Sequence, residues 1–370
     1  MIQENISISG RIYSIDALRG VTLFGILLVH ICGFFGFFEY TKLLTNDGII
    51  LHDGILFLLS QRCAPVFSML FGVSFFLILK KPTYTSRKFL WRCVLLIGIG
   101  LMNKLFYTYD ALLWYGIWGI VLLLFRYATS KSLLIFAILF FNLSLFLSSY
   151  NIGNQLLPII SNCSRYEIAE GILFSPLDYS LAESVKDYVR IGLNSGIFGT
   201  LSFFLIGYWF AKKGGITNVE KYARLNNVVI LGSLYLILYL MYYLLKFCVG
   251  IKISILYSYG NLFGALFMAF LFLLIYYKKP SSFKFLESYG KLGLTNYTLQ
   301  SLFGVLSMIL IIIPNKWDMP AILIYFLLFY GIQCYLSYLW LHYFTNGPME
   351  WLWRCATNLK FTSPLKLINK

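Results

Sequence analysis

Long apolar runs separated by short polar gaps extend over almost the whole sequence. A helix that crosses the hydrocarbon core of a bilayer needs roughly 20 mostly apolar residues. Runs of suitable length lie at 15–38, 54–79, 88–108, 111–127, 131–150, 189–211, 226–247, 253–277, 291–313 and 319–343. The pattern therefore predicts an all-α integral membrane protein, a bundle of about ten transmembrane helices.

One long connection interrupts this pattern, at about 151–188. It contains Ser175-Pro176 and several acidic residues, which favours a short surface cap over a further span. The other gaps are too short to hold a soluble domain. We therefore expect a single transmembrane domain over 1–370, with a short C-terminal tail at about 345–370.

The positions of lysine and arginine predict the orientation, because cytoplasmic loops carry an excess of these residues. With the N-terminus inside, the cytoplasmic segments hold 21 of the 30 Lys and Arg residues and the opposite segments hold 8. Both termini are then cytoplasmic. The 151–188 connection and the loop with His52 and Asp53 are extracytoplasmic.

Composition and charge agree with a membrane protein. Hydrophobic types make up 59% of the 370 residues and charged types 12%, about half the charged share of a typical soluble domain. The formal net charge is +15. In a nucleic-acid-binding protein such charge clusters on one face of a folded domain. Here the basic residues lie in the gaps between apolar runs, so we expect membrane lipids and no nucleic acid as partners.

The cysteines and histidines do not suggest a metal centre. The seven cysteines form no Cys-x-x-Cys pair and have no metal-like spacing to the three histidines. Most of them lie in apolar runs, where cysteine behaves as a small apolar side chain. The sequence predicts no metal site.

Two ionisable residues of the first predicted span, Arg19 and His30, are eleven residues apart. At about 100° per residue they share one face of the helix, roughly 16 Å apart along its axis. Ionisable groups are costly in a bilayer and mark candidate functional sites. Arg19 can bind a phosphate, and His30 can act as a general base or transient acyl acceptor. Alternatively, Arg19 only anchors the helix and His30 only bonds a neighbouring helix.

Two other residues are candidates for acid–base chemistry. Asp110, between the third and fourth predicted spans, either orients a catalytic histidine or forms an ion pair with Arg62 or Arg92. His52, beside Asp53 at the predicted outer face, either activates an acceptor hydroxyl or is a solvated loop residue.

A cluster of polar side chains lies near the inner end of the ninth predicted span. It comprises Thr295, Asn296, Gln300 and Ser301. Such groups are costly when they face lipid and useful when they face a cavity or another helix. They line a site for a pantetheine arm or a nucleotide, or they form hydrogen bonds between helices.

Five motifs occur in order along the chain. They are Arg11–His30, Phe67–Phe75, Asp110–Tyr115 with Gly119, Gly290–Ser301 and Gly347–Arg354. Together they resemble the YeiB-like family of bacterial polytopic membrane proteins, whose activity is not established. The segment that ends at Ser301 closely matches the Thr-Asn-Tyr-x-x-Gln-Ser motif of that family. Tyr109 stands where that family usually has Gly, and Asn103 stands where it often has His.

The Arg11–His30 motif also resembles the opening of transmembrane acyltransferases. These are the bacterial type-3 enzymes that O-acylate envelope sugars and the lysosomal heparan glucosaminide acetyltransferase. In the type-3 enzymes an Arg and a His eleven residues apart on the first helix are functional, and Arg19 and His30 fit that pattern. The YeiB-like family more often has Asn at the second position. His52 is a candidate for the lumenal histidine of the lysosomal enzyme.

This resemblance implies an acyltransferase of the bacterial cytoplasmic (inner) membrane. It would move an acyl group, expected to be acetyl, from cytoplasmic acyl-CoA to an envelope sugar or glycan. Arg19, Arg87 and Arg92 would hold the donor phosphates, and Asp110 would orient His30 or balance its charge. The alternative is a transporter or flippase of a small anionic or lipid-linked molecule, because polar groups at mid-membrane serve transport equally well. A structural or sensory protein is a third hypothesis.

Overall fold

The computed structural model describes residues 12–37, 50–51, 54–55, 58–59, 62–81, 84–104, 110–149, 197–249, 254–312, 317–361 and 363. The predicted site residue His52, the predicted 151–188 connection and the end of the C-terminal tail lie outside these residues. Over the described residues the chain forms helices and no strand, as the apolar runs predict.

The described helices follow one another along the chain with short connections where the connection is described. They are α1 (Tyr13–Phe37), α3 (Cys63–Leu79), α4 (Ser86–Lys104), α5 (Leu112–Leu122), α6 (Ser130–Ser149), α10 (Ile197–Lys212), α11 (Val219–Tyr222), α12 (Leu225–Leu244), α13 (Ser254–Lys278), α14 (Lys284–Lys291), α15 (Gly293–Ser307), α16 (Met319–Tyr343) and α17 (Pro348–Asn358).

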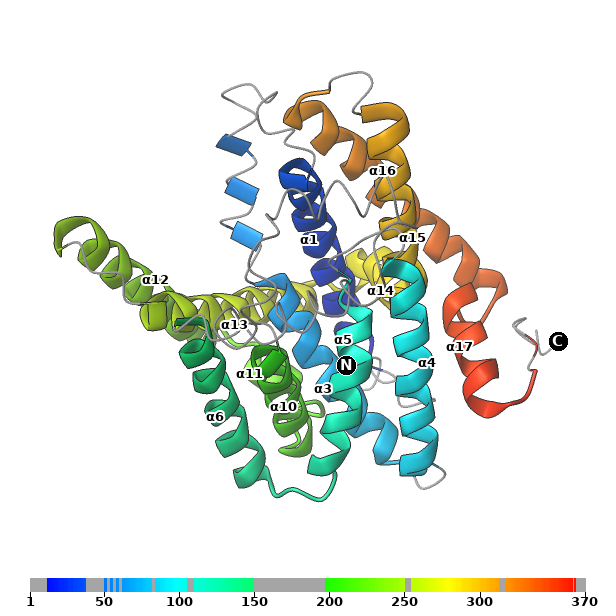
Figure 1. Ribbon diagram of the computed structural model, residues 1–370, viewed down its shortest axis with the longest axis horizontal. Coiled ribbons are helices and arrows are strands. Elements are labelled where there is room, and N and C mark those ends of the chain that lie inside the picture. The colour runs from blue at the N-terminus through cyan, green and yellow to red at the C-terminus, as the bar shows by residue number, and fades with distance from the viewer. Residues whose placement is uncertain are drawn as a thin grey trace, which may run out of the picture.

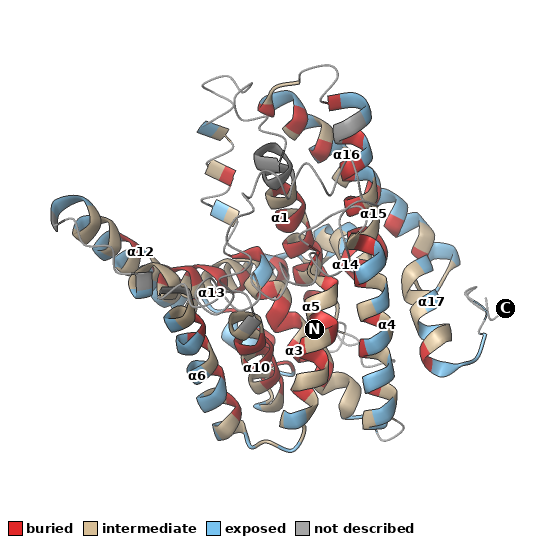
Figure 2. Ribbon diagram, viewed as in Figure 1, coloured by how far each residue is buried: buried red, intermediate tan, exposed pale blue. Residues whose placement is uncertain are grey.

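Six helices of the described chain are long and apolar enough to cross a membrane. They lie at Tyr13–His30, Ser130–Leu147, Leu225–Cys248, Ile255–Lys278, Gly293–Ile312 and Met319–Tyr343. Two shorter apolar helices lie at Cys63–Leu79 and Leu112–Phe125. Large apolar side chains are exposed along α6, α12 and α16, where Figure 2 shows much of the ribbon in pale blue. A soluble protein does not expose such extended apolar surface, so the chain is a multi-pass membrane protein.

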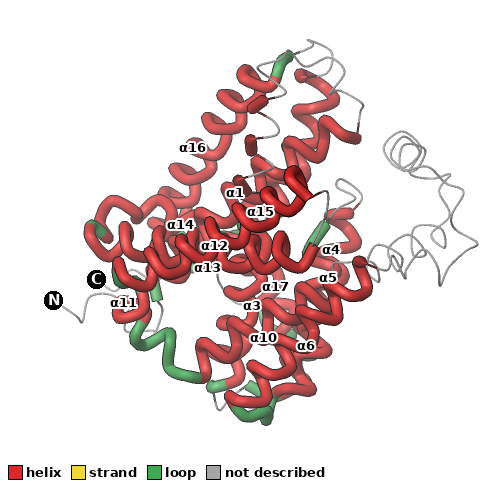
Figure 3. Tube along the Cα trace, turned by 90° about the vertical axis from the view of Figure 1, so that its left-hand side faces the viewer, coloured by secondary structure: helices red, strands yellow, loops and turns green. Residues whose placement is uncertain are grey.

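The helices form two groups joined through α1 and α3 (Figures 1 and 3). In the first group α3 packs on α10, α10 packs on α6, and α4 packs on α5. In the second group α14 packs on α1 and on α16. The α12–α13 hairpin extends from the first group, and α17 packs along α4 (Figure 1). The candidate site lies where the two groups meet.

Two glycines allow α3 and α10 to touch backbone to backbone. Gly72 of α3 faces the carbonyl oxygen of Phe204, and Gly207 of α10 faces the carbonyl oxygen of Met69. A Cβ atom at either glycine would collide with the facing carbonyl group. Small residues at helix contacts are the usual way in which membrane helices approach closely. The pair therefore determines the spacing of the most extensive helix contact in the first group.

A second pair of glycines brings α14 against the start of α1. Gly20 faces the backbone of Leu286, with an added Cβ placed 2.6 Å from the carbonyl oxygen. Gly290 faces the carbonyl group of Asp16, which a Cβ atom would meet directly. This close contact places the side chain of Arg19 beside the end of α14, where it lines the site described next.

Candidate functional site

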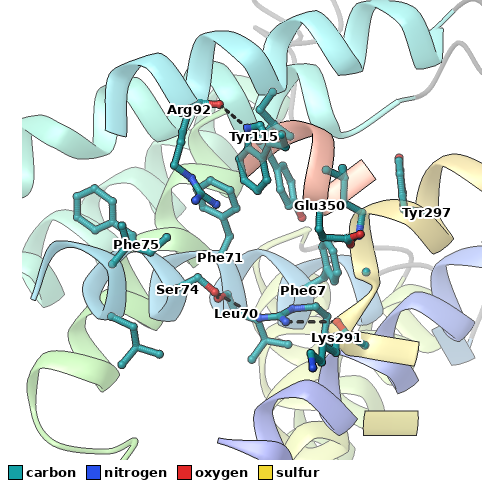
Figure 4. Close-up of a pocket in the computed structure, with 18 of the residues that line it drawn as sticks. Phe67, Leu70, Phe71, Ser74, Phe75, Arg92, Tyr115, Lys291, Tyr297 and Glu350 are labelled. Carbon is teal, nitrogen blue, oxygen red and sulfur yellow. Dashed lines mark hydrogen bonds between the residues drawn. The ribbon is translucent and has the colours of Figure 1, made fainter. Parts of the chain in front are cut away.

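A cavity of about 350 Å³ lies between α1, α3, α4, α5, α14, α15 and α17. Its lining combines aromatic and apolar side chains of α3, α4 and α5 with basic side chains from four helices (Figure 4). The basic residues are Arg19, Arg92, Lys291 and Arg354. Two carboxylates, Asp16 and Glu350, also belong to the described lining. The cavity therefore favours a ligand with an anionic part and a less polar part.

Arg19 enters this cavity from α1 and is held from three directions. Its Nη1 donates to Asp16 Oδ1 at 2.8 Å and to the Gly290 carbonyl at 3.3 Å, and its Nη2 donates to Ser74 Oγ at 3.3 Å. The side chain is 21% exposed. A guanidinium has about five N–H donors, so these bonds orient the group and leave donors for a ligand.

Arg92 enters the cavity from α4 and stacks on α17. Its guanidinium carbon lies 3.8 Å from the centroid of the Trp353 ring, and Nη1 donates to the Tyr84 hydroxyl at 3.2 Å. The Trp353 indole in turn donates to the Arg92 carbonyl at 3.1 Å. Arg87 is exposed in the first turn of α4 and does not line the cavity. The structure thus brings Arg19 and Arg92 to one cavity and leaves Arg87 outside it.

The N-terminus of α15 is capped by Glu350, the acidic residue of the C-terminal motif. Its carboxylate accepts hydrogen bonds from the backbone N–H groups of Leu294 at 2.7 Å and Thr295 at 3.1 Å, and from the Thr295 hydroxyl. The Thr295 hydroxyl also accepts a bond from the N–H of Met349 at 3.1 Å. The Gly290–Ser301 and Gly347–Arg354 motifs therefore contact each other, and their hydrogen bonds connect α15 with α17.

We expect Glu350→Ala to lower the free energy of unfolding by about 1–2 kcal/mol, because it removes the side chain that satisfies the first N–H groups of α15. Thermal unfolding in detergent measures this loss. Glu220→Ala is the matched control, since Glu220 is exposed in the first turn of the short helix α11. Equal melting temperatures for the two variants would contradict the capping role.

The other polar side chains of α15 bond to neighbouring helices. Asn296 Nδ2 donates to the Tyr289 carbonyl and to Ser337 Oγ, both at 3.0 Å. Gln300 Nε2 donates to the Tyr289 hydroxyl, which bonds Gln333 Oε1 at 3.1 Å. Asn296 and Gln300 are thus buried contacts between α14, α15 and α16, and neither lines the cavity. Their predicted contact with a donor remains a prediction.

His30 does not itself line the cavity but contacts Tyr297, which does. The two ring centroids are 5.9 Å apart and the rings are inclined by 74°, an edge-to-face contact. Tyr297 itself lines the cavity, as does Arg19 on the same helix as His30. Tyr297 is not among the site residues predicted from the sequence, although it lies in the middle of the Thr-Asn-Tyr motif. Its position between polar residues near the start of a helix is the sequence feature that could have identified it as a site residue.

Asp110 lies in the connection between α4 and α5, outside the candidate spans, and is 2% exposed. Its carboxylate accepts hydrogen bonds from Asn103 Nδ2 at 2.7 Å and from the Leu113 N–H at 3.1 Å. Asn103 also donates to Ser301 at 3.1 Å. Burial raises the pKa of Asp110 to about 6, although hydrogen bonds from Asn103, Leu113 and Tyr297 act in the opposite direction. The charge of Asp110 therefore changes close to neutral pH.

The ion pair of Asp110 with Arg62 or Arg92 that the sequence allowed does not occur among the described residues. Arg62 is buried against α12 instead, where Nη2 donates to the hydroxyls of Tyr235 at 3.0 Å and Tyr239 at 2.8 Å. No cluster of histidine, cysteine and carboxylate groups suited to a metal ion occurs in the described part of the chain.

The sequence matches two family models, one in each half of the chain. Residues 11–179 match a family described as "Heparan-alpha-glucosaminide N-acetyltransferase, catalytic" and residues 210–360 match one described as "Protein of unknown function (DUF418)". The resemblance to the YeiB-like family and to transmembrane acyltransferases is thereby confirmed. The first match contains Arg19, His30 and Asp110, and the second contains Tyr297 and Glu350.

Two bacterial proteins are similar over nearly their whole length. "Uncharacterized protein YxaH" of Bacillus subtilis (strain 168) is 27% identical, with 95% of each chain covered. "Uncharacterized 39.9 kDa protein in amylase 3'region" of Bacillus acidopullulyticus is 28% identical over 98% of this chain and 99% of its own. No solved structure is significantly similar to the chain.

Proposed function

We propose that this protein is a membrane-bound acyltransferase, which moves an acyl group, such as acetyl, from cytoplasmic acyl-CoA to a sugar or glycan of the bacterial envelope. The observation that carries the proposal is the cavity, which is lined by Arg19 and Arg92 and bounded by Tyr297 beside His30. The match of residues 11–179 to an acetyltransferase catalytic region supports it. We further propose an inner-membrane location, about ten spans and two cytoplasmic termini, from the apolar runs and the charge bias.

The cavity suits a donor that is charged at one end. Arg19 and Arg92 would bind the phosphate groups of acyl-CoA, because guanidinium groups form strong, often bidentate, hydrogen bonds with phosphate. The pantetheine arm would lie along the apolar and aromatic side chains of the cavity, such as Phe71 and Leu96. The thioester would then lie close to Tyr297 and within reach of His30.

Either of two routes completes the transfer. In the first, His30 takes the proton of the acceptor hydroxyl while the hydroxyl oxygen attacks the thioester carbonyl. The new C–O bond forms, the C–S bond breaks, and the thiolate of coenzyme A takes the proton from the imidazolium. In the second, an imidazole nitrogen attacks the thioester carbonyl, the C–N bond forms, and the C–S bond breaks to release the thiolate of coenzyme A. The acceptor oxygen then attacks the acyl-imidazole, the C–N bond breaks, and the hydroxyl proton passes through the released imidazole to the thiolate. In both routes the Asp110 carboxylate would stabilise positive charge on the imidazole.

The experiment is acyl transfer by purified protein in liposomes, with acyl-labelled acetyl-CoA as donor and an extract of envelope glycans as acceptor. Label that appears covalently in glycan supports the proposal. Counterflow of an intact anionic or lipid-linked molecule, without transfer from any of a series of acyl-CoA donors, would contradict it and favour a transporter.

We expect Arg19→Gln to raise the KM for acyl-CoA about 10- to 100-fold, because a hydrogen bond to a charged group contributes about 1.5–3 kcal/mol. Steady-state kinetics over a range of donor concentrations measures this change. Arg87→Gln is the matched control, because Arg87 is exposed and outside the cavity. A KM that rises equally in both variants would mean that the donor binds along the surface of α4 and not in the cavity.

A further inference from the structure

Tyr297 joins the two acid–base residues of the site. Its ring touches the ring of His30 edge to face, and its hydroxyl accepts a hydrogen bond from the N–H of Ala111 at 3.1 Å. The same hydroxyl hydrogen-bonds the carboxylate of Asp110. The side chain is 2% exposed, so its position is fixed by packing as well as by these bonds.

Tyr297 also belongs to the cavity wall. Figure 4 shows the side chain on α15 at one edge of the cavity. It therefore contacts, at once, the space for the donor, the imidazole of His30 and the connection that carries Asp110. A buried hydroxyl with a donor and an acceptor partner holds its ring in one place, because leaving either partner unbonded would cost free energy.

We propose that Tyr297 is a positioning residue, which orients the His30 ring toward the cavity and holds the Asp110 carboxylate in place through its hydroxyl. This inference rests on the proposed acyltransferase function. Loss of the hydroxyl would remove one hydrogen bond from the carboxylate, and a carboxylate with fewer donors holds its proton more tightly. The acid limb of the pH profile, which is the part where kcat/KM for acyl transfer falls as the pH is lowered, should then move to higher pH.

In the described part of the chain, the groups that interact with the Asp110 carboxylate are the Asn103 amide on α4, the backbone N–H groups of Leu112 and Leu113, and the hydroxyls of Tyr115 and Tyr297. His30 contacts the ring of Tyr297. An amide does not titrate, and a phenol has an ordinary pKa of about 10, outside the pH range of the acid limb. A change in the acid limb between wild type and a Tyr297 variant would therefore report on Asp110 or His30.

The test is Tyr297→Phe, assayed as kcat/KM for acyl transfer from about pH 5 to about pH 9 after wild-type transfer has been established. We expect the acid limb to move to higher pH and the rate to recover toward that of the wild type at about pH 8. If the limb moves by about one pH unit, the rate below about pH 6 falls roughly tenfold. Tyr208→Phe is the matched control. That tyrosine is also buried, but its hydroxyl bonds the Arg126 carbonyl at 2.9 Å, away from the site.

An unchanged pH profile in Tyr297→Phe would overturn the positioning role, and so would an equal loss of rate at every pH. The melting temperature of Tyr297→Phe, measured beside that of Tyr208→Phe, identifies a fold defect. Absence of transfer by the wild-type protein would instead contradict the proposed function, so the two failures are distinguishable.

Discussion

Replacing His30 by alanine should lower the kcat of acyl transfer by about 100- to 10,000-fold, the range by which a positioned general base accelerates a reaction. The expectation follows from the contact of His30 with Tyr297 at the edge of the cavity. It holds for both routes, because alanine can neither take a proton nor carry an acyl group. KM for the donor should change little, since Arg19 and Arg92 remain in place.

His342→Ala is the matched control for this experiment. His342 lies near the end of α16 and lines a second cavity of about 240 Å³, which adjoins the donor cavity and shares Asp16 and Lys291 with it. It contributes no side chain to the cavity assigned to the donor. A kcat for His30→Ala within about threefold of that of His342→Ala would show that His30 has no catalytic role.

The second large effect concerns folding. Gly72→Ala and Gly207→Ala should each prevent the close contact of α3 with α10, because the added Cβ would overlap a carbonyl group of the facing helix. Backbone atoms within packed helices cannot move aside as the end of a flexible side chain does. Overpacking of a core costs about 1–3 kcal/mol and sometimes more. We expect lower melting temperatures and a smaller yield of monodisperse protein in detergent.

Gly98 and Gly331 provide the controls for these variants. Both lie within helices, and an added Cβ at either would have no atom of the described residues within 4 Å beyond its own helix and chain neighbours. Alanine is more favourable than glycine in a helix by about 1 kcal/mol, so Gly98→Ala and Gly331→Ala should be neutral or stabilising. Equal losses at all four positions would mean that helix contacts at Gly72 and Gly207 are not especially close.

The sequence predicts the helices well because the length and apolarity of a span are local properties. The runs at 131–150, 226–247, 253–277 and 319–343 coincide with α6, α12, α13 and α16. The predicted run at 291–313 begins with Lys291, which instead ends α14; α15 starts at Gly293 after a turn at Leu292. The N–H groups at the new helix start are bonded by Glu350, more than 50 residues away in the sequence. No local pattern contains such information.

The sequence predicts only part of the candidate site, because only part of the site depends on local properties of the chain. The spacing of Arg19 and His30 indicates a shared helix face, which is a property of one helix. The proximity of His30, Tyr297 and Asp110 joins three segments that are distant in sequence. The polarity of Asn296 and Gln300 indicates that these side chains do not face lipid. It does not distinguish a position in a cavity from a contact with a neighbouring helix. Only the fold shows that they bond to Tyr289 and Ser337.

An experimental structure of the protein with coenzyme A bound would test the proposed donor site most directly. We expect phosphate groups within hydrogen-bond distance of Arg19 and Arg92, and the thiol against Tyr297 next to His30. Coenzyme A bound elsewhere, for example in the cavity beside His342, with the space between Arg19 and Tyr297 unoccupied, would contradict an acyl-CoA site in this cavity.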